Sequence, residues 1–425
     1  MLWVGIDTHL RRHSIEVLNG SENVMWRGQI NNDKEGFNKL LEKLKLIEDS
    51  NNQSIGAIFM NPTGNYHVPL KAFLEDHYRV ILVDARVSEH IRQSENLGRE
   101  KSDTADASVL AASAIRKPKV LERPNHERYP VSGLTRLMDS IKGNMTRISN
   151  QIKSDMVALF PEYPFYEDID SRTSLEILKT YATPEAINAA PMDEIVAVLK
   201  KASRGHFKME EAQNLKDAAR NSVGVRDAEG VYAFRIKMNV SRLLEEKMHL
   251  KEVEEEVERR TKDNEQVNNI SGIKGISELS AAAIVSEIGD IKQFDSPNKL
   301  LAYGSKSPNI KGSGGKIAAI GVTKVRNPYL SNTVYESSIS LVAHRNQEFL
   351  AVFNREIRKG KKPTQAYIVV GKRLIHHIYS IMKNNKPYRA NIPLSGDEKV
   401  KSMGYHHIGV TIFITFHSFS PRVSW

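Results

Sequence analysis

Three aspartates have a spacing that suits a divalent-cation site. Asp7 follows a short apolar stretch that predicts a strand, and active sites of α/β proteins lie at strand ends. Asp103 and Asp106 are three residues apart in a segment of helical composition, so they share one helix face. Carboxylates on one face repel each other unless a cation neutralises them. A cluster of all three would hold Mg²⁺ or Mn²⁺ and activate an oxygen nucleophile against a phosphodiester.

The alternative is that these acids are structural: Asp103 would cap its helix and Asp106 would face water. Two further polar residues end buried strands. Asn61 follows the apolar run over 55–60, and Asp84 ends the apolar run over 78–84. These strand ends match the position of Asp7 after its own strand.

Ser313 lies in the segment KGSGGK, where flanking glycines let a backbone come close to a phosphate. Lys311 and Lys316 add positive charge, so the serine would be a nucleophile or a phosphate ligand. The segment is not a P-loop, because Ile310 and Ile317 replace the glycine and the serine or threonine of that motif. A flexible basic loop is the alternative. We expect phosphate contacts from Lys101, Lys311, Gly314, Lys316, Lys324 and Arg326.

The composition indicates a polyanionic partner. The chain has 425 residues, a net charge of +10 and no cysteine. The charge favours nucleic acid or an anionic membrane surface, although it also serves solubility. The missing cysteines exclude disulfides, zinc knuckles, iron–sulfur clusters and a cysteine nucleophile, and they fit a cytoplasmic protein. No apolar run reaches the roughly 20 residues of a membrane span, and we expect neither a signal peptide nor membrane insertion.

Apolar spacing predicts an α/β region, a helical middle and a mostly helical third region. Strands that first form a run and then alternate with helices indicate a mixed sheet with helices on its faces. In the middle, residues 134–159 and 236–257 have the apolar spacing of coiled-coil helices. These two helices would pack as an antiparallel hairpin, which we favour, or as a dimer interface. The predicted domains are 1–118, 119–265 and 266–390, followed by a β-prone tail without assigned role over 391–425.

A glycine turn and an alanine-rich helix open the third region, in the sequence KGISELSAAAIVSEIG. This segment is similar to half of a helix-hairpin-helix, whose turn amides can face a DNA phosphate. An ordinary helix pair is equally compatible with it.

Several motifs, taken in order, resemble one family. VGIDTH, MNPTGNY, REKSDTADA and GSGGK occur in the order of the DEDD transposases of insertion sequence family 110, which are related to the Piv invertase. The segment KGISELSAAAIVSEIGDIKQFDSPNKLLAYGSKSPNIKGSGGK also resembles the start of that family's C-terminal domain. The likeness spans residues 2–388, and the order and spacing of the motifs make it specific.

The resemblance implies an RNase H-like (RuvC-type) N-terminal domain with a four-acid site for a divalent metal. Asp7 matches the first acid, and Asp103 and Asp106 match the last two. Ser313 matches the family serine that attacks DNA and forms a covalent phosphoserine link. The resemblance also implies dimers or tetramers, joined by the coiled-coil segment, in which metal site and serine come from different protomers. A structured noncoding RNA, the bridge RNA, would guide them.

One position departs from the family pattern. The family's second acid is a glutamate, where this chain has Asn61. Asparagine offers a carbonyl ligand without charge, so metal affinity should fall. We hypothesise that Asp84 supplies the missing carboxylate. The rival interpretation is an impaired enzyme.

Three functions are therefore weighed. The leading one is an RNA-guided DNA transposase or recombinase. The second is a metal-dependent nuclease or junction resolvase that uses only the N-terminal site, with Ser313 as a phosphate ligand. The third is an inactivated transposase remnant that binds nucleic acid in a salt-sensitive way and does not cut it.

Overall fold

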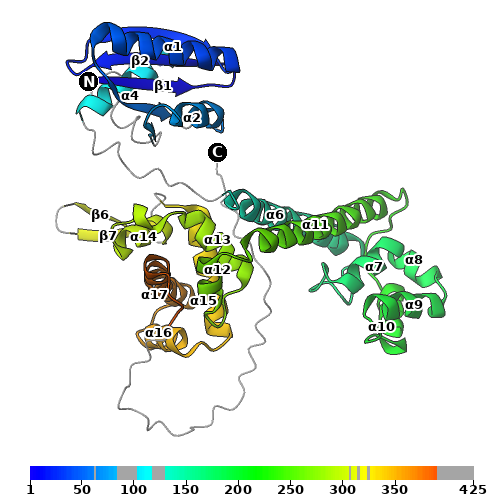
Figure 1. Ribbon diagram of the computed structural model, residues 1–425. Helices are drawn as coiled ribbons and strands as arrows, with labels where there is room; N and C mark the ends of the chain where they lie inside the picture. Colours follow the sequence, from blue (N-terminus) through cyan, green and yellow to red (C-terminus); the bar gives the residue numbers. More distant parts are fainter. Residues whose placement is uncertain are drawn as a thin grey trace, which may run out of the picture. The chain divides into compact units, whose positions relative to one another are not determined.

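The computed structural model describes most of the chain, which forms two compact units. One unit comprises residues 1–127 and the other 128–425, and each is considered by itself. The predicted boundary at residue 118 and the predicted tail over 391–425 lie outside the described residues. The structure describes residues 1–61, 64–83, 103–116, 130–305, 308–313, 316–322 and 326–389 (Figure 1).

The first unit contains a five-stranded sheet with the order β3-β2-β1-β4-β5. Antiparallel pairing joins β1 to β2 and β2 to β3, whereas β4 runs parallel to β1 and β5 runs parallel to β4. The mixed sheet expected for this region is confirmed, and its strand order is that of an RNase H-like domain. The strands are β1 (Leu2–Thr8), β2 (Arg12–Asn19), β3 (Val24–Asn31), β4 (Ile55–Asn61) and β5 (Val80–Leu82).

Helices cover both faces of this sheet (Figure 1). Alternate strand residues such as Val4 and Ile6 share a core with apolar side chains of α1 and α2. Phe59 and Ile81 point to the other face, where they share a smaller core with Val109 of α4. The central strands β1 and β4 are therefore buried on both faces, as expected for their nearly continuous apolar sequence. The helices are α1 (Lys34–Asn51), α2 (His67–Glu75) and α4 (Asp103–Arg116).

The helix α4 lies directly on β1 because residue 5 is a glycine. A Cβ atom at Gly5 would be 2.1 Å from the carbonyl oxygen of Ala107 and 2.7 Å from the amide nitrogen of Ala111. Both neighbouring atoms belong to helix backbone, so neither moves aside by a change of rotamer. Any side chain at position 5 would push α4 away from the sheet.

Two long helices in the second unit pack along each other in opposite directions. The Nδ2 of Asn144 on the first helix donates to Glu246 on the second at 3.2 Å. Near the end of the first helix, the carbonyl of Ala158 accepts from the amide of Val225 at 2.9 Å, just before the second helix begins. The two helices therefore pack as the antiparallel intramolecular pair that we favoured, and a dimer interface through them stays a prediction. The helices are α6 (Ser132–Leu159) and α11 (Val231–Thr261).

A group of shorter helices lies between these two in the sequence and packs against them through a core of its own. This core contains Ile152 and Leu159 of α6, Leu175 of α7, and Val240 of α11. Among the helices in the described part of the chain, none is both long and apolar enough to cross a bilayer. The short helices are α7 (Arg172–Thr180), α8 (Pro184–Ala189), α9 (Met192–Ala202) and α10 (Met209–Arg220).

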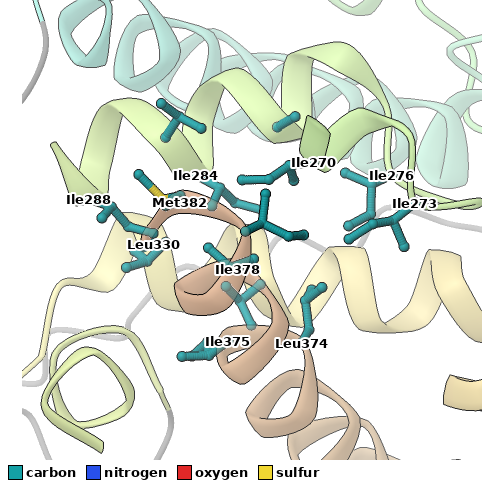
Figure 2. Close-up of a cluster of buried hydrophobic side chains, with 14 of the residues drawn as sticks. Ile270, Ile273, Ile276, Ile284, Ile288, Leu330, Leu374, Ile375, Ile378 and Met382 are labelled. Carbon is teal, nitrogen blue, oxygen red and sulfur yellow. The ribbon is translucent and has the colours of Figure 1, made fainter. Parts of the chain in front are cut away.

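The third region is mostly helical, as expected, and has a separate core. Figure 2 shows isoleucine side chains of α13 packed against Ile375, Ile378 and Met382 of α17, with Leu330 of α15 beside them. A two-stranded hairpin, β6 (Pro308–Ser313) and β7 (Lys316–Val322), connects α14 to α15. The helices are α12 (Glu265–Ser271), α13 (Glu278–Ile288), the 3₁₀ turn η1 (Ile291–Gln293), α14 (Pro297–Gly304), α15 (Pro328–Ala343), α16 (Gln347–Arg358) and α17 (Pro363–Asn384).

The glycine turn that suggested a helix-hairpin-helix joins α12 to α13. Gly275 has a φ of +103°, a left-handed backbone that glycine adopts without strain. A Cβ atom there would also lie 3.0 Å from the Cα of Leu341 in α15. The helix pair is therefore present, and a phosphate contact by its turn amides stays a prediction.

We predict that Gly5→Ala destabilises the first unit by about 1–3 kcal/mol, because the added methyl group overpacks the contact between α4 and β1. Urea unfolding of the full chain, followed by the fluorescence of Trp3 and Trp26, measures this loss. Gly20→Ala is the matched control, since the nearest atom to a Cβ there is 4.0 Å away. Equal stability of both variants would contradict the importance of the contact.

Candidate active site

Asp7 lies near the end of β1 on the sheet face that α4 covers, since it alternates with Gly5 along the strand. Its side chain is only 4% exposed. The Nε2 atom of His9 lies 2.9 Å from Asp7 Oδ2. Because the His9 side chain is 40% exposed, the imidazole stands between the buried carboxylate and solvent.

Asn61 is the direct neighbour of Asp7 in the parallel pairing of β1 with β4, so both side chains leave the sheet on the same face. The backbone carbonyl of Asn61 accepts from Thr8 Oγ1 at 2.7 Å. Its side-chain Oδ1 is buried and has no hydrogen-bond partner among the residues described. An orphaned buried acceptor costs about 1–3 kcal/mol, and a hard cation beside Asp7 would satisfy it. The two residues thus fit a metal ligand set.

The helix that carries the other two aspartates crosses the same face. Asp103 is the first residue of α4 and Asp106 lies in its first turn. Ala107, one turn after Asp103, touches Gly5, which is two residues before Asp7. The side chains of both aspartates lie outside the described residues, and no metal-binding group of three acids or histidines occurs among those described. Convergence of the three aspartates therefore stays a prediction that the backbone supports.

Ser313 ends β6 and pairs with Lys316 at the start of β7. The backbone here forms two paired antiparallel strands. The nucleophile, the phosphate ligand and the basic loop all stay predictions for this segment. Lys311 lies two residues earlier in β6, and Arg326 donates through Nε to Ser331 Oγ at 3.1 Å. The side chains of the hairpin lie outside the description. So do the whole residues Asp84, Lys101, Gly314 and Lys324.

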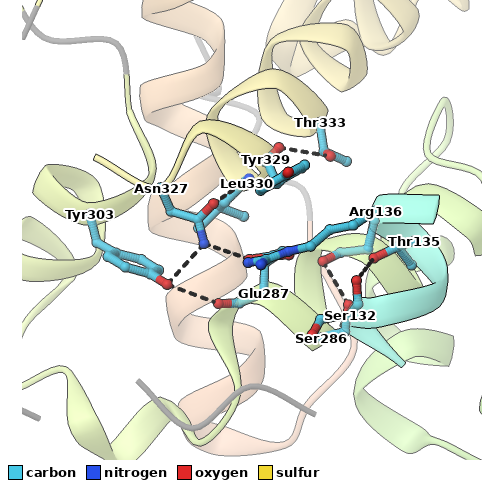
Figure 3. A network of polar contacts seen from close by, with 11 residues as sticks. Ser132, Thr135, Arg136, Ser286, Glu287, Tyr303, Asn327, Tyr329, Leu330 and Thr333 are labelled. Carbon is cyan, nitrogen blue, oxygen red and sulfur yellow. Dashed lines mark hydrogen bonds and ion pairs between the residues drawn. The ribbon is translucent and has the colours of Figure 1, made fainter. Parts of the chain in front are cut away.

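A buried asparagine ties together the two ends of the segment that carries Ser313 (Figure 3). The amide of Asn327 donates to the Tyr303 carbonyl at 2.7 Å, and its Nδ2 donates to the Tyr303 hydroxyl at 2.9 Å. Its Oδ1 accepts from the Leu330 amide at 3.1 Å and so caps α15. Asn327 therefore fixes where the hairpin leaves α14 and where it enters α15.

Glu287 of α13 connects this junction to α6. Glu287 is 1% exposed, and Arg136 donates to its two carboxylate oxygens at 2.6 and 2.8 Å. The Nδ2 of Asn327 donates to Glu287 Oε2 at 2.6 Å, and the Arg136 guanidinium stacks 4.3 Å from the centre of the Tyr329 ring. The hydrogen bond with Glu287 raises the pKa of Arg136. This bidentate pair holds the start of α6 against the base of the hairpin (Figure 3).

Sequence reasoning missed His9, Glu287 and Asn327. His9 carried a usable signal, because residues two apart at a strand end share one side of the chain. Glu287 carried none, since its partner Arg136 is 151 residues away in the sequence.

Two transposase family models match the chain. A transposase model of the DEDD IS110 type matches residues 4–161, which include Asp7, Asn61 and α4. The model of the transposase IS116/IS110/IS902 family matches residues 267–354, which include Ser313. Together the two matches extend over both candidate sites.

Three relatives agree with these matches. A Streptomyces coelicolor protein assigned as the mini-circle transposase for IS117 is 23% identical over 78% of this chain and 82% of its own length. An insertion element IS900 protein of 42 kDa from Mycobacterium paratuberculosis is 22% identical over 91% of this chain and 97% of its own length. The transposase for insertion sequence element IS1111A of Coxiella burnetii is 22% identical over 57% of this chain and 56% of its own length.

The chain belongs to the IS110 family of transposases. It is accordingly an insertion-sequence transposase, a class of enzyme that binds DNA and transfers its strands. The DEDD type of the N-terminal match implies dependence on a divalent metal and an RNase H-like fold, in agreement with the sheet order.

We predict that Glu287→Gln destabilises the second unit by roughly 3 kcal/mol, because it leaves Arg136 without its ionic partner. Urea unfolding measures this loss. Hydrogen exchange of residues 308–322 should quicken, since the junction loosens. Lys251→Gln breaks an ion pair whose side chains are 78% and 64% exposed and should change stability by less than about 1 kcal/mol. Equal effects of both substitutions would contradict a special role for Glu287.

Proposed function

We propose that this transposase cuts and rejoins DNA through a covalent bond between Ser313 and a strand end. The serine hydroxyl gives up its proton as its oxygen attacks the scissile phosphorus and forms a phosphodiester with the strand end. The bond from phosphorus to the departing sugar oxygen breaks, and that oxygen takes a proton. In the second step, the hydroxyl of another strand attacks the same phosphorus and releases the serine. Each ester bond broken is replaced by one formed, so the exchange needs no ATP.

The pairing of Asp7 with Asn61 is the single observation that best supports a metal-assisted reaction. Asp7, Asp103 and Asp106 would hold Mg²⁺ or Mn²⁺, with Asn61 Oδ1 as a neutral ligand. When bound, the cation would polarise the scissile phosphate and stabilise the charge of the leaving oxygen. The support is the buried Asn61 oxygen that lacks a partner among the described residues, together with α4 on the same sheet face.

We infer that Asp84 supplies the carboxylate that Asn61 lacks. The strand β5 is the neighbour of β4 in the sheet. The amide of Val83 donates to the Met60 carbonyl at 2.8 Å. Val83, the last residue described before Asp84, therefore lies at the same end of the sheet as Asn61 and Asp7.

The serine would act from a preset position at the end of a strand. Asn327 and Glu287 fix the base of the hairpin, so less freedom remains to be lost when DNA is bound. Phosphate contacts from Lys311 and Lys316 would hold the strand beside Ser313. Further contacts are assigned to Lys101, Gly314, Lys324 and Arg326.

Asp7 and Ser313 belong to different compact units, so the complete site requires both units to meet at one phosphate. We propose that this occurs in a dimer or tetramer, with the acids from one protomer and the serine from another. A structured noncoding RNA would select the DNA. The family membership supports both proposals.

Ser313→Ala should abolish the covalent protein–DNA complex, because the nucleophilic oxygen is gone. The measurement is transfer of labelled DNA to the denatured protein, with the full chain, Mg²⁺ and element-end DNA. Ser380→Ala is the control, since this serine is exposed on α17. Covalent capture by the Ser313→Ala chain would contradict the proposal. Cutting without capture by both the original chain and the variant would favour the nuclease, with Ser313 as a phosphate ligand.

Asp84→Asn should weaken Mn²⁺ binding roughly tenfold, and Asn61→Glu should strengthen it by a similar factor, since each changes one ligand charge. Titration calorimetry on the full chain measures both. Asp76→Asn, at the exposed C-cap of α2, should leave the affinity unchanged. An unchanged affinity in Asp84→Asn would remove Asp84 from the ligand set. Strand transfer that appears only in Asn61→Glu would identify the natural chain as the impaired enzyme.

A further inference from the structure

The sequence at the turn between α16 and α17 contains many positively charged residues. The two helices are labelled in Figure 1. We call this group of charged residues the α16–α17 basic turn. Glu356 is the acid within the same stretch of sequence, and it is 2% exposed. The five cationic residues are all exposed: Arg355, Arg358, Lys359, Lys361 and Lys362.

Glu356 gathers three of these cations around one buried carboxylate. Arg355 Nε and Lys359 Nζ each lie 3.0 Å from its Oε1, and Lys361 Nζ lies 2.5 Å from its Oε2. Hydrogen bonds from Lys361, Lys359 and Arg355 lower the pKa of Glu356 to about 2, so the carboxylate stays ionised at neutral pH. The side chains nevertheless remain exposed, by 59% for Arg355, 58% for Lys359 and 42% for Lys361. Their outer surfaces are therefore open to a further anion.

The number of cations exceeds what the fold needs. Arg358 and Lys359 at the end of α16 favour that helix through its dipole. Lys361 and Lys362 stand just before the start of α17, where positive charge opposes the helix dipole, and the first turn of α17 contains no acid. One carboxylate neutralises one charge, so four remain from these five cations. Arg358 and Lys362 form no ion pair within the described part of the chain.

We propose that the α16–α17 basic turn binds the phosphate backbone of duplex DNA. Convergent, exposed cations match closely spaced phosphates, whose neutralisation releases condensed counterions. Duplex DNA is the partner because strand transfer on DNA is the activity of the family. This proposal rests on DNA as the substrate of the proposed function, and it needs neither Ser313 nor the metal. DNA binding is therefore measured in the presence of EDTA. A failure here leaves the covalent chemistry untouched.

The first test compares two pairs of substitutions in the full chain. Arg358→Gln combined with Lys362→Gln should lower affinity for labelled duplex DNA. It should also reduce the slope of log K against log salt by roughly 1–2, since each lost phosphate contact contributes about 0.9. Lys200→Gln with Lys201→Gln removes the same charge from exposed positions in the last turn of α9 and should leave the slope unchanged. Equal slopes in the two double variants would overturn the proposal.

The second test uses the sign of a charge change. Glu356→Gln makes the chain more positive, so a diffuse attraction would tighten DNA binding. The proposal predicts several-fold weaker binding, because the cations lose the carboxylate that gathers them. Glu255→Gln makes the same charge change at a side chain that is 64% exposed and should not weaken binding. Binding by Glu356→Gln that matches or exceeds this control would overturn the proposal.

Two further measurements exclude other causes of a change in DNA affinity. Thermal unfolding reports whether Glu356→Gln alters the fold, and the Arg358 and Lys362 substitutions change exposed positions only, so they test the surface independently. The same titrations with a folded RNA distinguish the partner. Loss of RNA affinity with unchanged duplex DNA affinity would overturn the assignment to DNA.

Discussion

The backbone of α4 rests on the backbone of β1 at Gly5, and the arrangement of the first unit depends on this contact. A helix normally packs on a sheet through side chains, which hold the two backbones apart. Here the carbonyl of Ala107 occupies the space of a missing Cβ. The first turn of α4, with Asp103 and Asp106, therefore starts close to β1, the strand that contains Asp7. A glycine thus determines how near the backbone of this helix comes to the backbone of β1.

Burial gives the same region its chemical character. The Asp7 side chain is 4% exposed, with His9 at its outer side. Beside it the Asn61 amide oxygen has no partner among the described residues. Water screens charges weakly in such a place, so a cation would be held strongly by few ligands. In the second unit, by contrast, the buried acid Glu287 is fully engaged by Arg136 and Asn327. The region around Asp7 and Asn61 thus leaves an oxygen that can bind a ligand, whereas the contacts of Glu287 hold helices in place.

Much of the fold follows from local sequence. The apolar run before Asp7 formed β1, and Asp33 begins α1 by accepting the Gly36 amide at 2.7 Å. The apolar spacing of the two long helices also predicted their bounds to within a few residues, because a helix that packs along its whole length repeats its apolar positions.

Other features depended on contacts that no local pattern records. The glycines around Ser313 indicate a loop, since glycine is weakly strand-forming, yet cross-strand pairing with Lys316 makes a hairpin. No sequence pattern near Glu287 predicts its contact with Arg136, because this contact exists only after α6 and α13 have packed. For Asp103 and Asp106 the sequence predicted one helix face, and the structure adds the sheet face that this helix covers.

Convergence of the three aspartates around one cation is the central claim, and iron-directed cleavage tests it most directly. Fe²⁺ in place of Mg²⁺, with ascorbate and peroxide, cuts a protein backbone next to the bound ion. The account predicts cuts beside residue 7, beside residue 61 and in the first turn of α4, all lost in Asp7→Asn. Cuts confined to one of these segments, or an unchanged pattern in Asp7→Asn, would contradict it.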